Sequence, residues 1–337
     1  MKETDNIISM NPELLLDVRD IRKQFPVRTG LGQTKKWLKA VDGVSFGVKK
    51  ERIFALVGES GCGKSTVARL ILKLLTLNAG KIFFKGLDVS AIKGDELRRF
   101  RRSVQIIFQD PFASLNPRMR TIDTLSEPYV IHRIIPRREI KDRVVDLLNK
   151  VGLNQEVLTK YPHEFSGGQR QRICIARALS VSPELIIADE PLSALDVSIQ
   201  AQILNLLQEI KKNTAISMVF ISHDLRVVRY LSDEVAIMYL GKIVETGKTD
   251  DLFNAPKHPY TELLLSSAPK LRYHPGPFPG ASRPSTDLSD VPGAVDIPSG
   301  CPFHPRCPKR IDRCDKIIPE FRRSEESSVA CHLYYSS

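Results

Sequence analysis

Several apolar runs along the chain are too short for helices and indicate buried strands. The clearest cover residues 53–57, 104–108, 185–188 and 218–221. A strand buried on both faces of a parallel sheet carries such a nearly continuous apolar run. Helical spacing of apolar residues appears instead in the range 140–151, at Val144, Leu147, Leu148 and Val151. The pattern predicts an α/β fold with a mostly parallel sheet flanked by helices.

A glycine-rich loop follows the first of these strands. Residues 58–65 read Gly-Glu-Ser-Gly-Cys-Gly-Lys-Ser and lead into a helix-like stretch, 64–75. Backbone N–H groups of such a loop turn toward phosphate oxygens, and the next helix points its positive end at the same anion. Lys64 is expected to reach the β- and γ-phosphates of a nucleotide, and Ser65 to bind Mg²⁺. The alternative, a glycine turn that matches by chance, does not explain the strand before the loop and the helix after it.

Polar side chains stand at the carboxyl ends of three further strands. Asp189 and Glu190 end one run, Gln109 follows another, and His223 follows a third. Active groups gather at this edge of open α/β sheets. We expect Asp189 to hold Mg²⁺ through its water shell, Glu190 to polarise the attacking water, and Gln109 and His223 to sense the γ-phosphate. Taken alone, His223 would more often be an ordinary loop or core histidine.

A second short motif, Ser166-Gly167-Gly168-Gln169, precedes an amphipathic run. Ser166 and Gln169 also fit a capping box, and a capped helix start is itself an anion site. With the elements above, the chain resembles the ATP-binding subunits of ABC transporters over most of its length. The resemblance assigns Walker A to 58–65, the Q-loop to Gln109, the signature to 166–169, Walker B to 185–190, the D-loop to 193–196 and the switch histidine to His223. Phe165 replaces the usual leading Leu of the signature, outside the phosphate-contacting residues.

Longer stretches resemble one branch of that family, the oligopeptide/dipeptide permease ATPases. They are residues 109–119, 161–165, 193–200, 257–261 and 299–308. The insert at 27–39 and the Val41–Phe46 stretch after it are similar to the F type of the paired subunits. The resemblance implies an ATPase that powers an importer of di- or oligopeptides. Nickel, glutathione or sugar cargo stays an alternative within the branch.

The resemblance also implies which residues bind nucleotide. ATP of this subunit is assigned to Phe25, Gly58, Glu59, Ser60, Gly61, Cys62, Gly63, Lys64, Ser65, Thr66, Gln109 and Asp189. Mg²⁺ is assigned to Ser65, Gln109 and Asp189. The ATP of the facing subunit is assigned to Ser166, Gly167, Gly168, Gln169 and Asp196. Catalysis falls to Glu190, His223 and Gln109. Phe25 is the aromatic residue expected to stack on adenine. Two alternatives stay open: Phe25 is an ordinary core residue, or Trp37 in the polar insert stacks on adenine instead.

Charge and hydropathy limit the function classes. The net charge is +11, with basic clusters at 97–102 and 132–138. Such clusters fit nucleic acid, but solvated helix faces or an anionic membrane surface explain them as well. No run approaches a transmembrane span of about 20 apolar residues, and the first residues lack a signal-peptide core. We therefore expect a peripheral protein on the cytoplasmic face of the cytoplasmic membrane, with no nucleic-acid partner.

Three rival functions share the nucleotide chemistry or the fold. DNA-repair or chromosome ABC ATPases typically insert long coiled coils or zinc modules before the signature, whereas only 56 residues separate Gln109 from Ser166 here. Translation-type ABC proteins normally carry two cassettes, and this chain has one. A non-ATPase adaptor is hard to reconcile with intact catalytic motifs. The resemblance to transporter subunits implies several partners. They are a paralogous D-type ATPase subunit as heterodimer partner, two transmembrane permease subunits and an extracytoplasmic substrate-binding protein.

By the same resemblance, the chain divides into a nucleotide-binding domain at 1–255 and an extension at 256–337. The domain is expected to have antiparallel strands at its N-terminal side and a helical subdomain at about 112–164. Many prolines lie in 269–298, which predicts an irregular linker.

Four cysteines follow this linker: Cys301, Cys307, Cys314 and Cys331. Clustered cysteines in a cytosolic protein suggest metal, but their spacing is not that of ordinary zinc sites. Four thiolates suit a [4Fe-4S] cluster, which the resemblance also implies, while zinc and free thiols stay open. Cys62 and Cys174 are expected to be small packed residues. We expect the phosphate site to keep its intrinsic ATP affinity when Cys307→Ser loosens this tail, because none of its ligands lies beyond His223.

Overall fold

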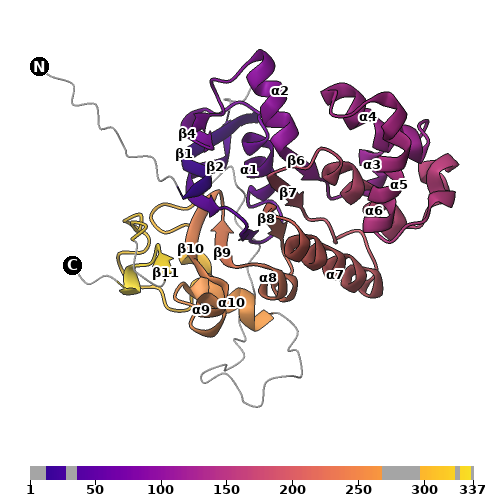
Figure 1. The fold of residues 1–337 in the computed structure, drawn as a ribbon. Helices are drawn as coiled ribbons and strands as arrows, with labels where there is room; N and C mark the ends of the chain where they lie inside the picture. The colour runs from indigo at the N-terminus through magenta and orange to yellow at the C-terminus, as the bar shows by residue number, and fades with distance from the viewer. Residues whose placement is uncertain (1–12, 28–35, 268–296, 323–326, 335–337) are drawn as a thin grey trace, which may run out of the picture.

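The computed structural model describes residues 13–27, 36–267, 297–322 and 327–334. Most of the expected exposed insert at 29–36 and of the proline-rich segment at 269–298 lies outside these ranges. Within them the strands form two sheets, one antiparallel and one mainly parallel (Figure 1). The prediction of an α/β fold with antiparallel strands at the N-terminal side is confirmed.

The antiparallel sheet contains the strands near the N-terminus, in the order β2-β1-β4-β5. Its members are β1 (Leu14–Val27), β2 (Lys36–Lys49), β4 (Ala79–Phe84) and β5 (Leu87–Asp88). The second sheet has the order β11-β10-β9-β3-β8-β7-β6. Its parallel members are β3 (Ile53–Val57), β6 (Val104–Ile107), β7 (Leu185–Asp189), β8 (Ser217–Ser222) and β9 (Glu234–Tyr239), and β10 (Lys242–Lys248) and β11 (Ser327–Val329) complete it antiparallel.

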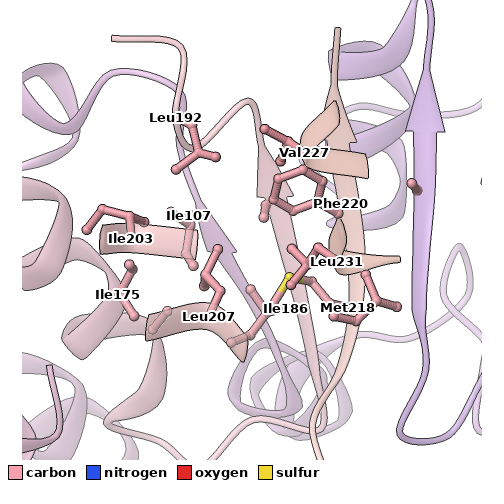
Figure 2. Close-up of a cluster of buried hydrophobic side chains, with 14 of the residues drawn as sticks. Ile107, Ile175, Ile186, Leu192, Ile203, Leu207, Met218, Phe220, Val227 and Leu231 are labelled. Atoms are coloured by element: carbon pink, nitrogen blue, oxygen red, sulfur yellow. The ribbon is translucent and has the colours of Figure 1, made fainter. Parts of the chain in front are cut away.

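The parallel strands are apolar throughout because both faces of the sheet are covered. In β3, Ile53, Ala55 and Val57 belong to one hydrophobic cluster. Phe54 and Leu56 belong to a second cluster on the opposite face. Successive side chains of a strand alternate between faces, so one continuous run supplies both cores. Figure 2 shows the first cluster, in which residues of β6, β7 and β8 pack against side chains from the helices that cover this face.

Helices surround the sheets and form a separate lobe on one side (Figure 1). They are α1 (Lys64–Ile71), α2 (Gly94–Ser103), α3 (Pro111–Ser114), α4 (Thr121–His132), α5 (Ile140–Lys150), α6 (Gly167–Leu179), α7 (Val197–Asn213), α8 (Leu225–Leu231), α9 (Thr249–Asn254) and α10 (Pro259–Ser267). The predicted helical subdomain, 112–164, contains most of α3 and all of α4 and α5, and α6 packs against all three. The helix expected at 140–151 is α5, whose Val144, Leu147 and Leu148 are buried.

The C-terminal extension packs on the edge of the main sheet. Strand β11 pairs with β10, with Glu245 opposite Val329, and the Ala330 N–H donates to the Val244 carbonyl at 2.8 Å. Phe303 is fully buried in the same hydrophobic cluster as the sheet. The extension therefore packs Phe303 and β11 against the nucleotide-binding core. The division into 1–255 and 256–337 stays a prediction about domains.

Candidate nucleotide site

The glycine-rich loop connects β3 to α1, so the strand and the helix that the sequence predicts on its two sides are both present. Gly63 has φ 106°, and a Cβ atom there would lie 2.0 Å from the Ala40 carbonyl oxygen. A Cβ at Gly58 would lie 2.1 Å from the Met238 carbonyl oxygen. Left-handed backbone and close approach of another strand both demand glycine. These two glycines fix the path of the loop between the two sheets.

Lys64 lies under this loop, with only 4% of its side chain exposed. Its Nζ donates to the carbonyls of Gly58 at 2.7 Å and Glu59 at 3.0 Å. The Glu190 carboxylate is 3.9 Å away. A buried ammonium needs such partners, because burial without them is costly. The loop thus holds a positive charge where phosphate oxygens are expected.

Asp189 and Ser65 meet beside the loop. The Ser65 hydroxyl donates to Asp189 Oδ1 at 2.9 Å, and Asp189 is 6% exposed. Burial raises the pKa of the Asp189 carboxyl above its ordinary value, and the Ser65 hydrogen bond partly offsets this. A hydroxyl and a buried carboxylate suit Mg²⁺, which prefers oxygen ligands. The pair fits the predicted Mg²⁺ site, in which a cation would favour the charged carboxylate.

Glu190 is the point at which the predicted catalytic residues converge. Gln109 Nε2 donates to Glu190 Oε2 at 3.2 Å, and His223 Nδ1 lies 3.2 Å from the same oxygen. Glu190 has φ 47°, in the left-handed region. Such backbone costs a non-glycine residue about 1–3 kcal/mol and is common at functional sites. The strands that precede these residues, β6, β7 and β8, are neighbours in the sheet, which explains the convergence.

The signature motif begins α6 on the exposed surface. The Ser166 hydroxyl accepts from the Gln169 N–H at 3.3 Å, and Gln169 Oε1 accepts from the Ser166 N–H at 3.1 Å. The predicted capping box is therefore confirmed. A Cβ at Gly168 would lie 2.5 Å from a methyl of Ile199, so α6 and α7 meet closely here. Ser166, Gln169 and Asp196 are exposed, and their role toward a facing subunit stays a prediction.

Phe25 and Trp37 lie on neighbouring strands. Phe25 is half-buried in β1, and the Lys23 ammonium lies 5.3 Å from its ring centroid. Trp37 is in β2, opposite Pro26, and is exposed. Strand β2 begins at Lys36, so the part of the polar insert that contains Trp37 is paired with β1. Adenine stacking on Phe25 stays a prediction, with Trp37 beside it as the competitor.

The extension contacts the phosphate loop, which the sequence did not predict. Arg306 Nη1 and Nη2 donate to the two carboxylate oxygens of Glu59 at 2.9 and 3.0 Å. The Glu59 N–H donates to the Tyr260 hydroxyl oxygen at 3.1 Å. The extension and the phosphate loop are therefore in direct contact, and unchanged ATP affinity in Cys307→Ser stays a prediction. No local signal marks these partners, because each motif is recognisable only within its own stretch.

The cysteines fall into two groups. Cys62 and Cys174 are buried and packed, as predicted. Cys301, Cys314 and Cys331 are buried and Cys307 is half-buried. Burial raises the pKa of the Cys301 and Cys307 thiols to about 11, with smaller contributions from the neighbouring thiols, and the Cys301 N–H donates to the Cys314 carbonyl at 2.7 Å. The extension thus gathers its cysteines, but no three or more His, Cys, Asp or Glu side chains among the described residues are arranged to hold a metal ion.

Comparison with known proteins agrees with this geometry. The ABC transporter family profile matches residues 41–193, and that of the oligopeptide/dipeptide transporter C-terminal region matches 244–314. The cassette cbiO1 of Clostridium perfringens, part of an ABC transporter complex, has 26% identity and a TM-score of 0.62, covering 72% of this chain and 92% of that one. A dimeric ATP-binding cassette bound to ADP and Pi shares the fold at 24% identity, with a TM-score of 0.62 over 69% of this chain and 98% of that one. The fold is that of an ABC-type ATPase.

Relatives that match almost the whole chain show to which branch of the ABC transporters it belongs. The oligopeptide transport ATP-binding protein AppF of Bacillus subtilis is 49% identical, covering 96% of this chain and 98% of the relative. The dipeptide transport ATP-binding protein DppF of Escherichia coli is 42% identical over 94% and 93%. OppF of Salmonella typhimurium is 44% identical over 97% and 98%. The chain belongs to the ATP-binding subunits of the oligopeptide/dipeptide branch of ABC transporters. No helix among the described residues has the length and apolar character of a membrane span.

Proposed function

We propose that this chain is the ATP-hydrolysing subunit of an importer for di- or oligopeptides, peripheral to the cytoplasmic face of the cytoplasmic membrane. The observation that carries the proposal is the convergence of Gln109, His223 and Lys64 on Glu190 in a chain 49% identical to an oligopeptide transport ATP-binding protein. ATPase activity follows from the family. Peptide cargo is supported by the names of the relatives, and nickel, glutathione or sugar cargo is the alternative.

The catalytic steps are derived from the positions of the side chains. Phosphoryl transfer depends mainly on positioning and electrostatic stabilisation. Lys64 and the loop N–H groups would hold the phosphates of ATP. Bound Mg²⁺, held by Ser65, Gln109 and Asp189, would supply charge neutralisation on those phosphates. Glu190, oriented by Gln109 and His223, would take the proton of the attacking water, and His223 would support the γ-phosphate.

The exposed signature motif and D-loop support the pairing of this chain with a second ATPase subunit. Ser166, Gly167, Gly168, Gln169 and Asp196 are proposed to contact ATP on a facing D-type subunit, and exposure of Ser166, Gln169 and Asp196 supports this. Two transmembrane permease subunits and an extracytoplasmic binding protein complete the proposed importer. Ser166→Arg would place a bulky side chain against the partner's nucleotide and is expected to impair that site. A fully active homodimer of this chain alone would contradict the heterodimer.

Cargo is tested in the reconstituted importer. The transporter is placed in proteoliposomes with its binding protein, and ATP turnover is measured with peptide, nickel, glutathione or sugar. We expect peptide alone to stimulate turnover and to accumulate inside. The Glu190→Gln variant is the matched control for uptake without hydrolysis. Stimulation by one of the other cargoes, with none by peptide, would contradict the peptide assignment.

We also propose that Cys301, Cys307, Cys314 and Cys331 bind one [4Fe-4S] cluster with a structural role. The four thiols match such a cluster in kind and number, and binding would require them to move from their present positions, in which no three of them are arranged around a metal ion. The cluster would cross-link a segment that buries few apolar side chains of its own. Anaerobic purification followed by iron and sulfide analysis tests the proposal, with Cys307→Ser as the variant and Cys174→Ser as the matched control. Zinc alone, or four free thiols, would refute it.

A further inference from the structure

One carboxylate of the phosphate loop is held by a residue from the distant C-terminal extension. Arg306 makes two parallel hydrogen bonds to Glu59, the second residue of the loop, at 2.9 and 3.0 Å. The Arg306 side chain is 5% exposed and that of Glu59 is 27% exposed. Paired N–H donors matching both oxygens of a carboxylate give the strongest form of this ion pair. The contact is therefore more than a surface salt bridge.

The surroundings of Arg306 hold its guanidinium in place before any nucleotide binds. The Arg306 Cζ atom lies 5.9 Å from the ring centroids of both Tyr239 and Phe303. The Tyr239 hydroxyl oxygen accepts from Nη1 at 3.5 Å. Phe303 is fully buried in the core, which ties the short 3-10 helix His304–Arg306 to the sheet. A guanidinium fixed this way loses little rotamer entropy when it pairs.

The residue that Arg306 binds, Glu59, also contacts Lys64. The Glu59 carbonyl accepts from Lys64 Nζ at 3.0 Å, and the Glu59 N–H donates to Tyr260 of α10 at 3.1 Å. Glu59 is thus bound through its carboxylate, N–H and carbonyl at once. Its carboxylate and N–H contact the extension, while its carbonyl contacts the lysine of the loop. The position of the extension is therefore coupled to the position of this loop.

A carboxylate in a phosphate-binding loop creates an electrostatic problem. The polyphosphate of ATP is strongly anionic, and an unpaired Glu59 beside it would repel it. Arg306 neutralises that carboxylate from the side of the extension. We propose that Arg306 is a positioning residue of the nucleotide site, which neutralises and anchors Glu59 so that the loop accepts ATP. The inference rests on the loop being the ATP site, which Lys64→Ala tests separately.

Simple docking of the extension is the competing explanation, and it makes a different prediction. If Arg306 only docks the tail, removing either partner of the pair has the same effect, and removing both does not help. If Arg306 neutralises Glu59, its loss exposes an unpaired carboxylate, whereas Glu59→Gln removes that carboxylate. The double variant then recovers ATP binding. The two explanations are separated by the effect of Glu59→Gln alone and by whether adding Glu59→Gln to Arg306→Met restores ATP binding.

The experiment titrates the full chain with Mg-ATP by calorimetry. Arg306→Met is expected to weaken binding about tenfold, which equals about 1.4 kcal/mol and is at the low end for a bond between charged groups. Glu59→Gln is expected to lower ATP affinity less than Arg306→Met does, and adding it to Arg306→Met is expected to recover most of the lost affinity. Arg306→Lys, which keeps the charge, is expected to recover most of the loss. In the assembled importer, Arg306→Met should raise the KM for ATP and leave kcat nearly unchanged.

A second ion pair of the extension supplies the matched control. Lys309 Nζ lies 2.7 Å from Glu262 of α10, and both groups are partly exposed. Lys309→Met removes a tail contact that does not involve the loop and is expected to leave ATP affinity unchanged. If Arg306→Met does not fold, Arg306→Gln removes the same charge with a smaller change. Unchanged ATP affinity in a folded Arg306 variant, or a double variant as weak as Arg306→Met, would overturn the proposal.

Discussion

Replacing Glu190 by Gln is the sharpest test of the site, because the change keeps size and hydrogen bonding but removes one charge. Glu190 receives a hydrogen bond from Gln109 and lies beside His223, both at 3.2 Å. An amide keeps the shape of this cluster. It cannot take a proton from water, so the variant separates catalysis from binding.

Glu190→Gln is expected to lower ATP turnover but not ATP affinity. Loss of a general base typically costs about 10²–10⁴ in rate, so turnover is expected to fall about a hundredfold or more, or about 2.7 kcal/mol. Lys64 lies 3.9 Å from the Glu190 carboxylate. At an effective dielectric constant of about 20 this pair attracts by about 4 kcal/mol, largely offset by desolvation of the two groups. Without the carboxylate, Lys64 is freer to bind phosphate, so ATP affinity should hold or increase.

The assay pairs phosphate release from the assembled importer with ATP titration of the purified chain. Glu184→Gln is the matched control, since Glu184 makes a surface ion pair with Lys85 at 2.9 Å and lies outside the site. Turnover near that of the control would refute the role of Glu190. A loss of ATP affinity equal to the loss of turnover would instead show that Glu190 supports the phosphate loop rather than the chemistry.

Three further predictions address the loop and the buried polar groups. Lys64→Ala should weaken ATP binding at least about tenfold, since it removes a charged donor worth about 1.5–3 kcal/mol; unchanged affinity in a titration would argue against the loop. Gly63→Ala should lower the free energy of unfolding by about 2 kcal/mol or more, because its Cβ would lie 2.0 Å from the Ala40 carbonyl oxygen at φ 106°; urea unfolding measures this, and no loss would be inconsistent with the backbone seen. Burial lowers the pKa of His258 from 6.5 to about 4, so the unfolded chain binds the extra proton between these values and stability falls as pH drops through that window, by up to about 3 kcal/mol. The His258 Nδ1 accepts from the Tyr260 N–H at 3.0 Å, so His258→Asn, which keeps an acceptor, should flatten this part of the pH profile, and equal profiles would contradict the assignment.

Most of the nucleotide site could be predicted from the sequence, because its parts are local. A glycine loop between a strand and a helix is recognisable within about a dozen residues, and its chemistry follows from residue type. Apolar runs that end in Asp189, Gln109 and His223 also indicate parallel strands, whose carboxyl ends meet at one edge of a sheet. The convergence on Glu190 was therefore predictable, although its left-handed backbone was not.

The tertiary structure alone decided how the extension joins the site. Arg306 and Glu59 are 247 positions apart, and neither residue type nor local spacing marks them as partners. Strand β2 likewise begins inside the polar insert, at Lys36, because it pairs there with β1. Local patterns encode local backbone and chemistry, whereas the choice among many possible charged partners depends on which surfaces packing brings together. The sequence by itself thus determined the phosphate loop and the candidate catalytic residues beside it, and only the packed core placed a C-terminal arginine on that loop.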